Sequence, residues 1–393
     1  MANYTDKQKS IDFFVVYMIL VFAVCVRSSK LIKRLYVNNF RSLVAFEMRF
    51  DSMNVLCGVN GAGKSSVFDV IQFICSLAIG NCFFGKDSDE SRRIVSHLDF
   101  TRWMQSPVQE FEIELTYDDY LFKYVIHLEQ QDNHIPRIIK ETAVCDDKEI
   151  YTRNLDGVDF DNGRSGFPLD WHQAALASIQ SVPERKEVEL LRQAFMELLV
   201  LRPDVHSITS ESKTEDQMLN LNMGNFTSWY RNLYQSQEFS DTLRESLKTV
   251  WEDLKYLNLD NAGMSVKVMK LRFEKVDLLF DQLSDGEKML IGLYAIHAAL
   301  SLGKINTVLI DEPDNFVSLQ ELQPWFLAMS ELADEKHQII IISHNGEILN
   351  VNTAKILYFS RDNHSSPTRA EELNSFGSML PSEVLARGWG GQT

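Results

Sequence analysis

A glycine-rich loop between a predicted strand and a predicted helix constrains this chain more than any other feature. The strand covers residues 53–57 (MNVLC), the loop runs from Gly58 to Ser65 (GVNGAGKS), and residues 65–79 show helical periodicity. Glycines let the backbone curl so that several N–H groups point at phosphate oxygens. We therefore predict an α/β nucleotide-binding fold, in which Lys64 reaches the β- and γ-phosphates and Ser65 offers its hydroxyl to Mg²⁺. The flanking strand and helix disfavour the alternative of a chance glycine-rich turn.

A second apolar strand, residues 307–310 (TVLI), ends in two carboxylates. Ligands of open α/β sheets bind at the carboxyl ends of the strands. We expect Asp311 to hold Mg²⁺ through water and Glu312 to polarise the attacking water. A strand that ends in a solvated acidic turn is the simpler interpretation, and the phosphate loop in the same chain counts against it.

Two further motifs end at positions where a side chain or a helix terminus can meet an anion. Residues 283–288 (LSDGEK) place a serine N-cap and a glycine before a helical run, which predicts a helix amino terminus with free N–H groups. A capped helix without a ligand is the alternative. Residues 338–342 (QIIII) form an apolar strand followed by Ser343 and His344, from where His344 could contact a γ-phosphate.

These four motifs, in this order along the chain, resemble those of the ABC-type ATPases. The signature at 283–288 is more similar to the RecF/SMC branch than to transporters, and residues 39–42 (NFRS) and 311–314 (DEPD) are also similar to the RecF-like group. Within that branch, residues 311–325 and 381–389 resemble the compact AAA/ABC-like ATPases of bacterial anti-phage defence operons, which are relatives of the Septu and OLD ATPases.

The resemblance implies an enzyme that binds and hydrolyses ATP with Mg²⁺ and whose two copies sandwich the nucleotide. The implied ATP-binding residues are Gly58, Asn60, Gly61, Gly63, Lys64, Ser65 and Ser66. The implied metal ligands are Ser65 and Asp311, the catalytic base is Glu312, and the switch histidine is His344. The signature residues that would close on the γ-phosphate from the second copy are Ser284, Gly286 and Glu287.

Some positions of the family pattern are less sharply marked in this sequence. Residues 315–319 would form the loop that links the two sites of the dimer. Gln105 and Gln173 are both candidates for the glutamine-loop residue, and Arg41 is a candidate for a contact near the nucleotide.

The element pattern and the resemblance together predict an ABC-type P-loop fold with a mixed-sheet core lobe and a helical lobe. Strands are expected at 31–40 and 43–50, a hairpin at 109–127, loops at 146–168, mostly helices from 170 to 258, and strands at 266–280. The predicted division is an extension at 1–29, the core lobe at 30–165 and 263–365, the helical lobe at 166–262 and an irregular tail at 366–393.

Composition excludes some classes of protein. The formal net charge of −16 argues against a protein that coats DNA non-specifically. The five cysteines are odd in number and form no CxxC pair, which predicts reduced thiols in a cytoplasmic protein and no zinc or iron–sulfur site. The apolar run at 13–26 is shorter than the roughly 20 residues of a membrane helix. An upstream extension, an extra packed helix and a membrane anchor stay open for this run, and we expect no membrane partner.

Two functions compete. The first is an ATP-driven switch in anti-phage defence that acts with a separate effector such as a nuclease, because fewer than about 50 residues follow His344, which is below the size of a domain. The alternative is a RecF-like repair or recombination ATPase, which would bind DNA in an ATP-dependent and strongly salt-dependent way. The signature at 283–288 disfavours a transporter ATPase, and the short predicted helices exclude long coiled-coil arms.

Overall fold

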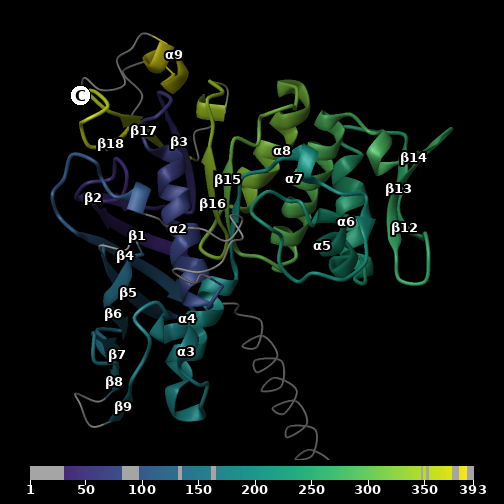
Figure 1. Ribbon diagram of the computed structural model, residues 1–393. Coiled ribbons are helices and arrows are strands. Elements are labelled where there is room, and N and C mark those ends of the chain that lie inside the picture. Colours follow the sequence, from purple (N-terminus) through teal and green to yellow (C-terminus); the bar gives the residue numbers. More distant parts are fainter. Residues whose placement is uncertain are drawn as a thin grey trace, which may run out of the picture.

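A parallel sheet lies at the centre of the molecule (Figure 1), and the glycine-rich loop, the acidic pair and His344 lie at or just after the ends of three of its strands. The computed structural model describes residues 31–81, 97–131, 135–160, 165–346, 348–350, 354–373 and 380–386. The strands of the parallel sheet, in spatial order, are β10 (Leu198–Leu201), β15 (Thr307–Asp311), β16 (Gln338–Ile342), β3 (Met53–Gly58), β17 (Lys355–Ser360) and β18 (Arg369–Glu372). Neighbours from β10 to β17 run parallel, and β18 pairs antiparallel with β17.

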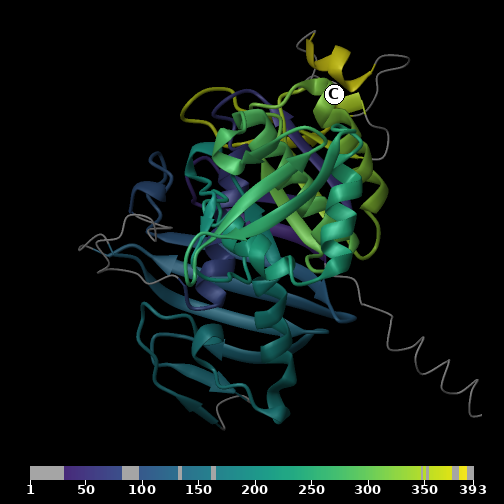
Figure 2. The same ribbon diagram turned by 90° about the vertical axis from the view of Figure 1, so that its right-hand side faces the viewer.

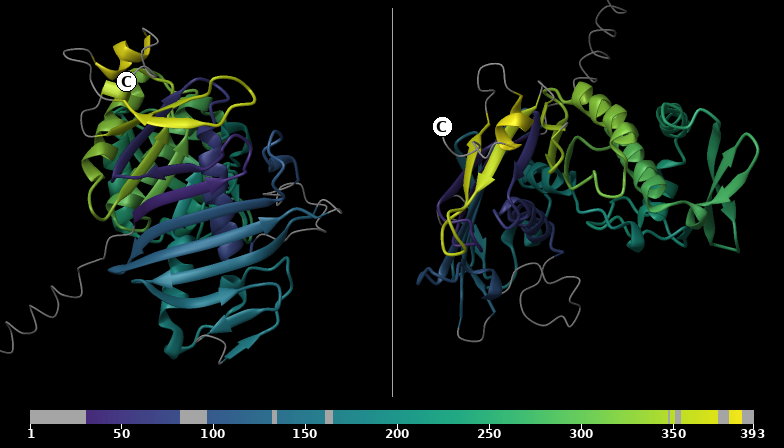
Figure 3. Two further views of the ribbon diagram at one scale, coloured as in Figure 1. Left: turned by 90° about the vertical axis from the view of Figure 1, so that its left-hand side faces the viewer. Right: turned by 90° about the horizontal axis from the view of Figure 1, so that it is seen from above.

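Both faces of this sheet are buried, which explains why its strands read as continuous apolar runs. Leu309 and Ile340 face a core that includes helix α2, whereas Val308 and Ile341 face a second core that includes helices α7 and α8. Figure 3 shows the two groups of helices on opposite sides of the sheet. The bounds of these helices are α2 (Lys64–Ala78), α7 (Asp285–Ser301) and α8 (Leu319–Leu332). The first agrees within one residue with the helix predicted at 65–79.

An antiparallel sheet packs on the α2 side, where the rings of Phe73 and Phe111 lie 5.4 Å apart. Its strands, in spatial order, are β2 (Phe46–Arg49), β1 (Leu31–Asn38), β4 (Val108–Tyr117), β5 (Tyr120–Glu129), β6 (Arg137–Cys145), β7 (Lys148–Arg153), β8 (Val158–Phe160) and β9 (Ser165–Phe167). The hairpin predicted at 109–127 is confirmed as β4 and β5, with Asp118 and Asp119 both at positive φ in the turn.

The prediction of loops at 146–168 is wrong, because β7, β8 and β9 extend the antiparallel sheet there. Asp146 and Asp147 adopt positive φ and form a tight turn, so the polar composition marks a hairpin. Alternate residues of the following strands, such as Tyr151 and Val158, are buried. Burial of one face of the antiparallel sheet therefore stabilises strands that the polar composition did not indicate.

A second lobe lies beside the parallel sheet, on the side opposite to α2 (Figures 1 and 2). It contains α5 (Phe226–Leu233), α6 (Gln237–Leu247) and a small sheet of β11 (Glu211–Ser212), β12 (Leu254–Asn261), β13 (Lys267–Phe273) and β14 (Asp277–Leu279). In β13 and β14 it confirms the strands predicted at 266–280.

The expectation of a mostly helical segment at 166–262 needs correction. Helices α3 (Ala175–Ser178) and α4 (Lys186–Met196) join the core of α2, and β10 enters the parallel sheet, so these elements pack with the core lobe. β12 pairs with β13 over most of its length. Pairing with the distant strand β15 in the case of β10, and with the following strand β13 in the case of β12, overrides the local helical pattern. The predicted boundaries between the lobes stay a prediction.

The end of the chain is more regular than predicted. The irregular tail expected at 366–393 contains β18 and the short helix α9 (Pro381–Ala386). The apolar run at 13–26 lies outside the described residues, so its role stays open. Among the residues that the structure describes, no helix is both long and apolar enough to cross a membrane.

One buried carboxylate joins the antiparallel sheet to α3. The Glu141 side chain on β6 is fully buried and accepts hydrogen bonds from the hydroxyls of Tyr124 (2.8 Å) and Tyr151 (2.7 Å). It also accepts from the backbone N–H groups of Ala175 (2.6 Å) and Leu176 (2.9 Å), at the amino terminus of α3. A carboxylate with this many donors replaces its lost hydration and fixes α3 on the sheet.

We predict that Glu141→Ala destabilises the protein by about 3 kcal/mol, because it leaves two tyrosine hydroxyls and two backbone donors buried without an acceptor. Urea unfolding followed by tryptophan fluorescence measures the effect. Glu149→Ala on neighbouring β7, where the side chain is exposed, is the matched control and should change stability little. Equal stability of the two variants would refute the structural role assigned to Glu141.

Candidate functional site

The glycine-rich loop between β3 and α2 has a backbone that only glycine adopts without strain. Gly58, Gly61 and Gly63 have φ values of 132°, 76° and 102°. A Cβ atom on Gly58 would lie 2.1 Å from the carbonyl oxygen of Phe359, so a side chain there would push β17 away from β3. The glycine-rich loop therefore packs closely against β17 and connects the end of β3 at Gly58 to the start of α2 at Lys64.

Lys64 lies inside this loop with its ammonium held by the backbone. Its Nζ donates to the carbonyl oxygens of Gly58 (2.9 Å) and Val59 (3.1 Å), and the side chain is buried. Burial lowers the pKa of Lys64, and the negative charges of Glu312 and Asp311 are among the neighbours that oppose this effect. A buried cation near the head of a helix is a strong binding partner for a phosphate anion.

Asp311 ends β15 directly beside the loop, with a side chain that is only 6% exposed. Its Oδ2 accepts a hydrogen bond from Nε of Arg202 at 3.1 Å, while its buried Oδ1 has no hydrogen-bond partner. Burial raises the pKa of Asp311, and Arg202 and the hydroxyl of Ser65 partly offset this rise. A buried oxygen without a partner next to a serine hydroxyl fits Mg²⁺, a cation that prefers oxygen ligands.

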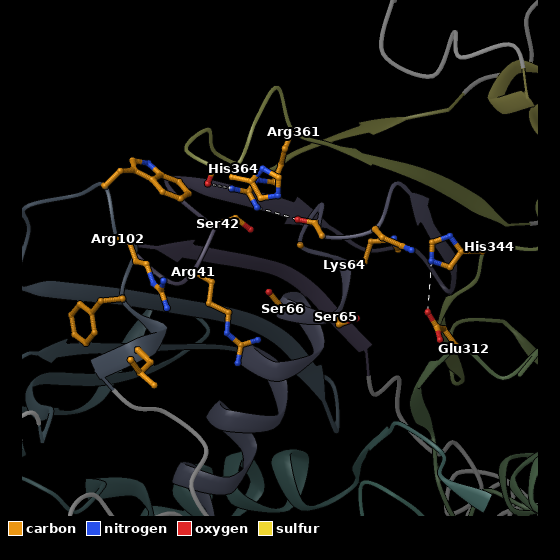
Figure 4. Close-up of a pocket in the computed structure, with 16 residues that line it drawn as sticks. Arg41, Ser42, Lys64, Ser65, Ser66, Arg102, Glu312, His344, Arg361 and His364 are labelled. Atoms are coloured by element: carbon orange, nitrogen blue, oxygen red, sulfur yellow. Dashed lines mark hydrogen bonds and ion pairs between the residues drawn. The ribbon is translucent and has the colours of Figure 1, made fainter.

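Glu312 and His344 face each other at the carboxyl ends of β15 and β16 (Figure 4). Nε2 of His344 lies 3.7 Å from Oε1 of Glu312, and the side chains are 40% and 43% exposed. Asn315 donates to the other carboxylate oxygen of Glu312 at 2.9 Å. Glu312 itself has a φ of 53°, an unusual conformation for this residue that its backbone hydrogen bond to Ile342 (2.9 Å) supports. An exposed carboxylate held in this way can accept a proton from water.

A cavity of about 470 Å³ joins these elements, a size typical of small-molecule sites. In Figure 4, Arg102, Arg361 and His364 lie at one end, Glu312 and His344 lie at the other, and Lys64, Ser65 and Ser66 lie between them. The cavity is lined by Arg41, Ser42, Asn60, Gly61, Gly63, Lys64, Ser65, Ser66, Leu98, Phe100, Arg102, Trp103, Glu312, His344, Arg361 and His364. Several cations around an elongated cavity suit an extended polyanion.

The structure brings together most of the site residues that the sequence predicted. Asn60, Gly61, Gly63, Lys64, Ser65 and Ser66 line the cavity with Glu312 and His344, and Gly58 and Asp311 lie directly behind them. Arg41, the candidate for a contact near the nucleotide, also lines it. The two glutamine-loop candidates, Gln105 and Gln173, do not, so neither gains support from the cavity.

Sequence reasoning missed the residues at the far end of the cavity. Arg361 donates to the carbonyl oxygens of Gly61 (3.1 Å) and His364 (2.7 Å), and its guanidinium lies 5.6 Å from the ring centre of Trp103. These residues come from segments that have no motif of their own. No local signal marks them, because only the pairing of β17 with β3 brings the segment after β17 to the glycine-rich loop.

The signature residues lie on a different surface. Ser284 caps α7, where its N–H and its hydroxyl both donate to the Glu287 carboxylate at 2.8 and 2.7 Å. A Cβ atom on Gly286 would lie 2.7 Å from the carbonyl oxygen of Phe316, in the segment after the acidic strand. None of these three signature residues lines the cavity that contains Lys64.

Comparisons with known proteins agree with this description. Residues 31–159 match the family model of the AAA ATPase domain. The OLD nuclease of Thermus scotoductus is 23% identical over 361 residues, which cover 84% of this chain and 62% of that protein. The chain therefore spans about three fifths of the length of this curated relative.

Solved structures show the same fold. An SMC head bound to the C-terminal winged-helix domain of ScpA aligns with a TM-score of 0.55 and 16% identity, over 87% of this chain and 98% of that chain. The SMC head domain of Pyrococcus furiosus with an extended coiled coil, bound to the C-terminal domain of ScpA, aligns with a TM-score of 0.55 and 14% identity, over 87% and 96%. The chain therefore has the ABC-type P-loop fold of the SMC heads, and its sequence is similar to the AAA ATPase domain and to an OLD nuclease.

Proposed function

We propose that two copies of this chain close on Mg-ATP, hydrolyse it, and use the closure as a conformational switch. One observation carries the proposal: the cavity contains the phosphate loop, Glu312 and His344, whereas the signature helix of the same copy faces elsewhere. A site that needs both parts is completed by a second copy, and two-fold symmetry then completes two sites at once.

The residues of one copy divide the chemistry among them. The glycine-rich loop and Lys64 bind the phosphates, and the Lys64 ammonium exchanges its two backbone carbonyl partners for phosphate oxygens. Ser65 and Asp311 hold Mg²⁺, which neutralises charge on the phosphates. Glu312 accepts the proton of the attacking water, and His344, 3.7 Å from it, contacts the γ-phosphate and senses its loss.

The second copy contributes the amino terminus of α7. The free N–H groups of the first turn and the hydroxyl of Ser284 approach the γ-phosphate, while Gly286 allows close packing. Glu287 accepts two hydrogen bonds from Ser284, so we assign it the role of supporting Ser284. Its negative charge would repel the phosphate, and we therefore place it outside direct contact with the phosphate.

The biological role we propose is anti-phage defence, in which closure licenses a separate effector such as a nuclease. The support is the similarity to the OLD nuclease of Thermus scotoductus and the resemblance of residues 311–325 and 381–389 to defence ATPases. The RecF-like role is the alternative, and it predicts ATP-dependent binding of DNA that weakens steeply with salt.

We predict that Glu312→Gln retains ATP and forms a stable dimer, because it binds the nucleotide but accepts no proton from water. Light scattering with and without Mg-ATP measures the mass, and Lys64→Ala, which loses the phosphate contact, is the control that should stay unchanged. A Glu312→Gln protein that hydrolyses ATP at the normal rate would show that another residue is the base. Binding of the Glu312→Gln protein to labelled duplex DNA, measured with ATP at increasing salt, distinguishes the two proposed roles. The RecF-like role predicts binding that needs ATP and weakens steeply with salt.

A mixing experiment tests the shared site directly. Lys64→Ala and Ser284→Arg should each abolish hydrolysis, but a mixed dimer contains one site in which both parts are intact. An equal mixture should therefore recover about a quarter of the wild-type rate if the subunits exchange freely and each site works alone. Lys64→Ala mixed with the double variant is the control, since it can build no intact site. No recovery from two folded, exchanging variants would argue against a site shared between copies.

A further inference from the structure

A row of alternating charges runs from the cavity to the metal-binding carboxylate. Arg41, which lines the cavity (Figure 4), forms ion pairs with Asp69 and with Asp99, the latter at 2.8 Å. Asp69 on α2 also accepts a hydrogen bond from Arg202 at 3.1 Å, and Arg202 donates in turn to Asp311 at 3.1 Å. The five residues come from separate segments of the chain, so only the fold creates this row.

The sheet register places Arg202 beside Asp311. β10 pairs parallel with β15, with Leu201 opposite Ile310, so the next residue of each strand emerges at the same carboxyl edge. The N–H of Arg202 donates to the carbonyl oxygen of Leu221 at 2.7 Å, which anchors the backbone at this point. Arg202 is thus held by a backbone hydrogen bond and by two carboxylates.

This contact determines which oxygen of Asp311 is available. Arg202 engages Oδ2, whereas the buried Oδ1 has no hydrogen-bond partner. A carboxylate that is only 6% exposed is costly to bury without a cation, and Arg202 supplies that cation without lining the cavity. We propose that Arg202 is a positioning residue that holds the Asp311 carboxylate in the orientation that leaves Oδ1 available for Mg²⁺. The inference rests on the proposed function, in which Asp311 is a metal ligand.

Asp69 extends this role to the other side of the site. It lies on the helix that follows the glycine-rich loop and bridges two arginines, so it fixes Arg202 at the metal side and Arg41 at the cavity. Removing Asp69 takes one of two carboxylate partners from each arginine, whereas removing Arg202 takes the guanidinium away from Asp311 directly. Ligand-supporting partners of this kind commonly change metal affinity by about 10- to 100-fold when they are mutated.

The test is the Mg²⁺ dependence of nucleotide binding, followed by the fluorescence of an N-methylanthraniloyl derivative of ATP. Arg202→Gln should raise the Mg²⁺ concentration for half-maximal binding by about tenfold and leave binding in EDTA unchanged. Arg202→Lys should recover part of the difference, because it restores the charge but not the geometry of the guanidinium. Asp69→Asn should shift the Mg²⁺ dependence in the same direction, and the double variant should show less than the product of the two effects.

Arg272→Gln is the matched control, because Arg272 forms an exposed ion pair with Asp277 in the second lobe and should leave the Mg²⁺ dependence unchanged. A folded Arg202→Gln protein with the wild-type Mg²⁺ dependence would overturn the inference. A lower Mg²⁺ requirement would also overturn it, since Arg202 would then compete with the metal. Failure of the wild-type chain to bind the nucleotide at any Mg²⁺ concentration would reject the proposed function itself.

Discussion

The parallel pairing of β3 with β16 and β17 is the constraint on which the rest of the structure depends. Through this pairing, and that of β16 with β15, the glycine-rich loop, the acidic pair at Asp311 and the segment at His344 leave the sheet at the same edge. The strands are buried on both faces, so their register is strongly fixed by packing. A shift of one residue would move each chemical group to the opposite face.

The free-energy cost of burying charged groups is a second constraint on the site. Lys64 and Asp311 are both buried beside the glycine-rich loop, and each has partners that hold it: backbone carbonyls for Lys64, and Arg202 for Asp311. Each group can nevertheless bind a further partner. The ammonium can exchange carbonyls for phosphate, and Oδ1 of Asp311 can accept a metal. Both groups thus lie where a bound nucleotide and its metal ion would supply further partners.

The fold keeps the signature residues apart from the cavity that contains Lys64. The core lobe contains the cavity, whereas the signature helix α7 presents its amino terminus elsewhere. The segment that follows the acidic strand touches both parts, since Asn315 donates to the cavity residue Glu312 at 2.9 Å and the carbonyl oxygen of Phe316 lies against Gly286. Closure of two copies and the state of the nucleotide would therefore act on the same segment.

The sequence alone determined the local elements and the motif residues, because the loop from Gly58 to Ser65 and the apolar strand before Asp311 have patterns that few structures satisfy. It did not determine the strands at 148–167, the place of β10 in the sheet, or the roles of Arg202 and Arg361, which have no local signature. The place of β10 depends on pairing with the distant strand β15, and the strands at 148–167 depend on burial against the core. Only the tertiary structure decides them, because the energy of such pairing and burial does not appear in any short window of sequence.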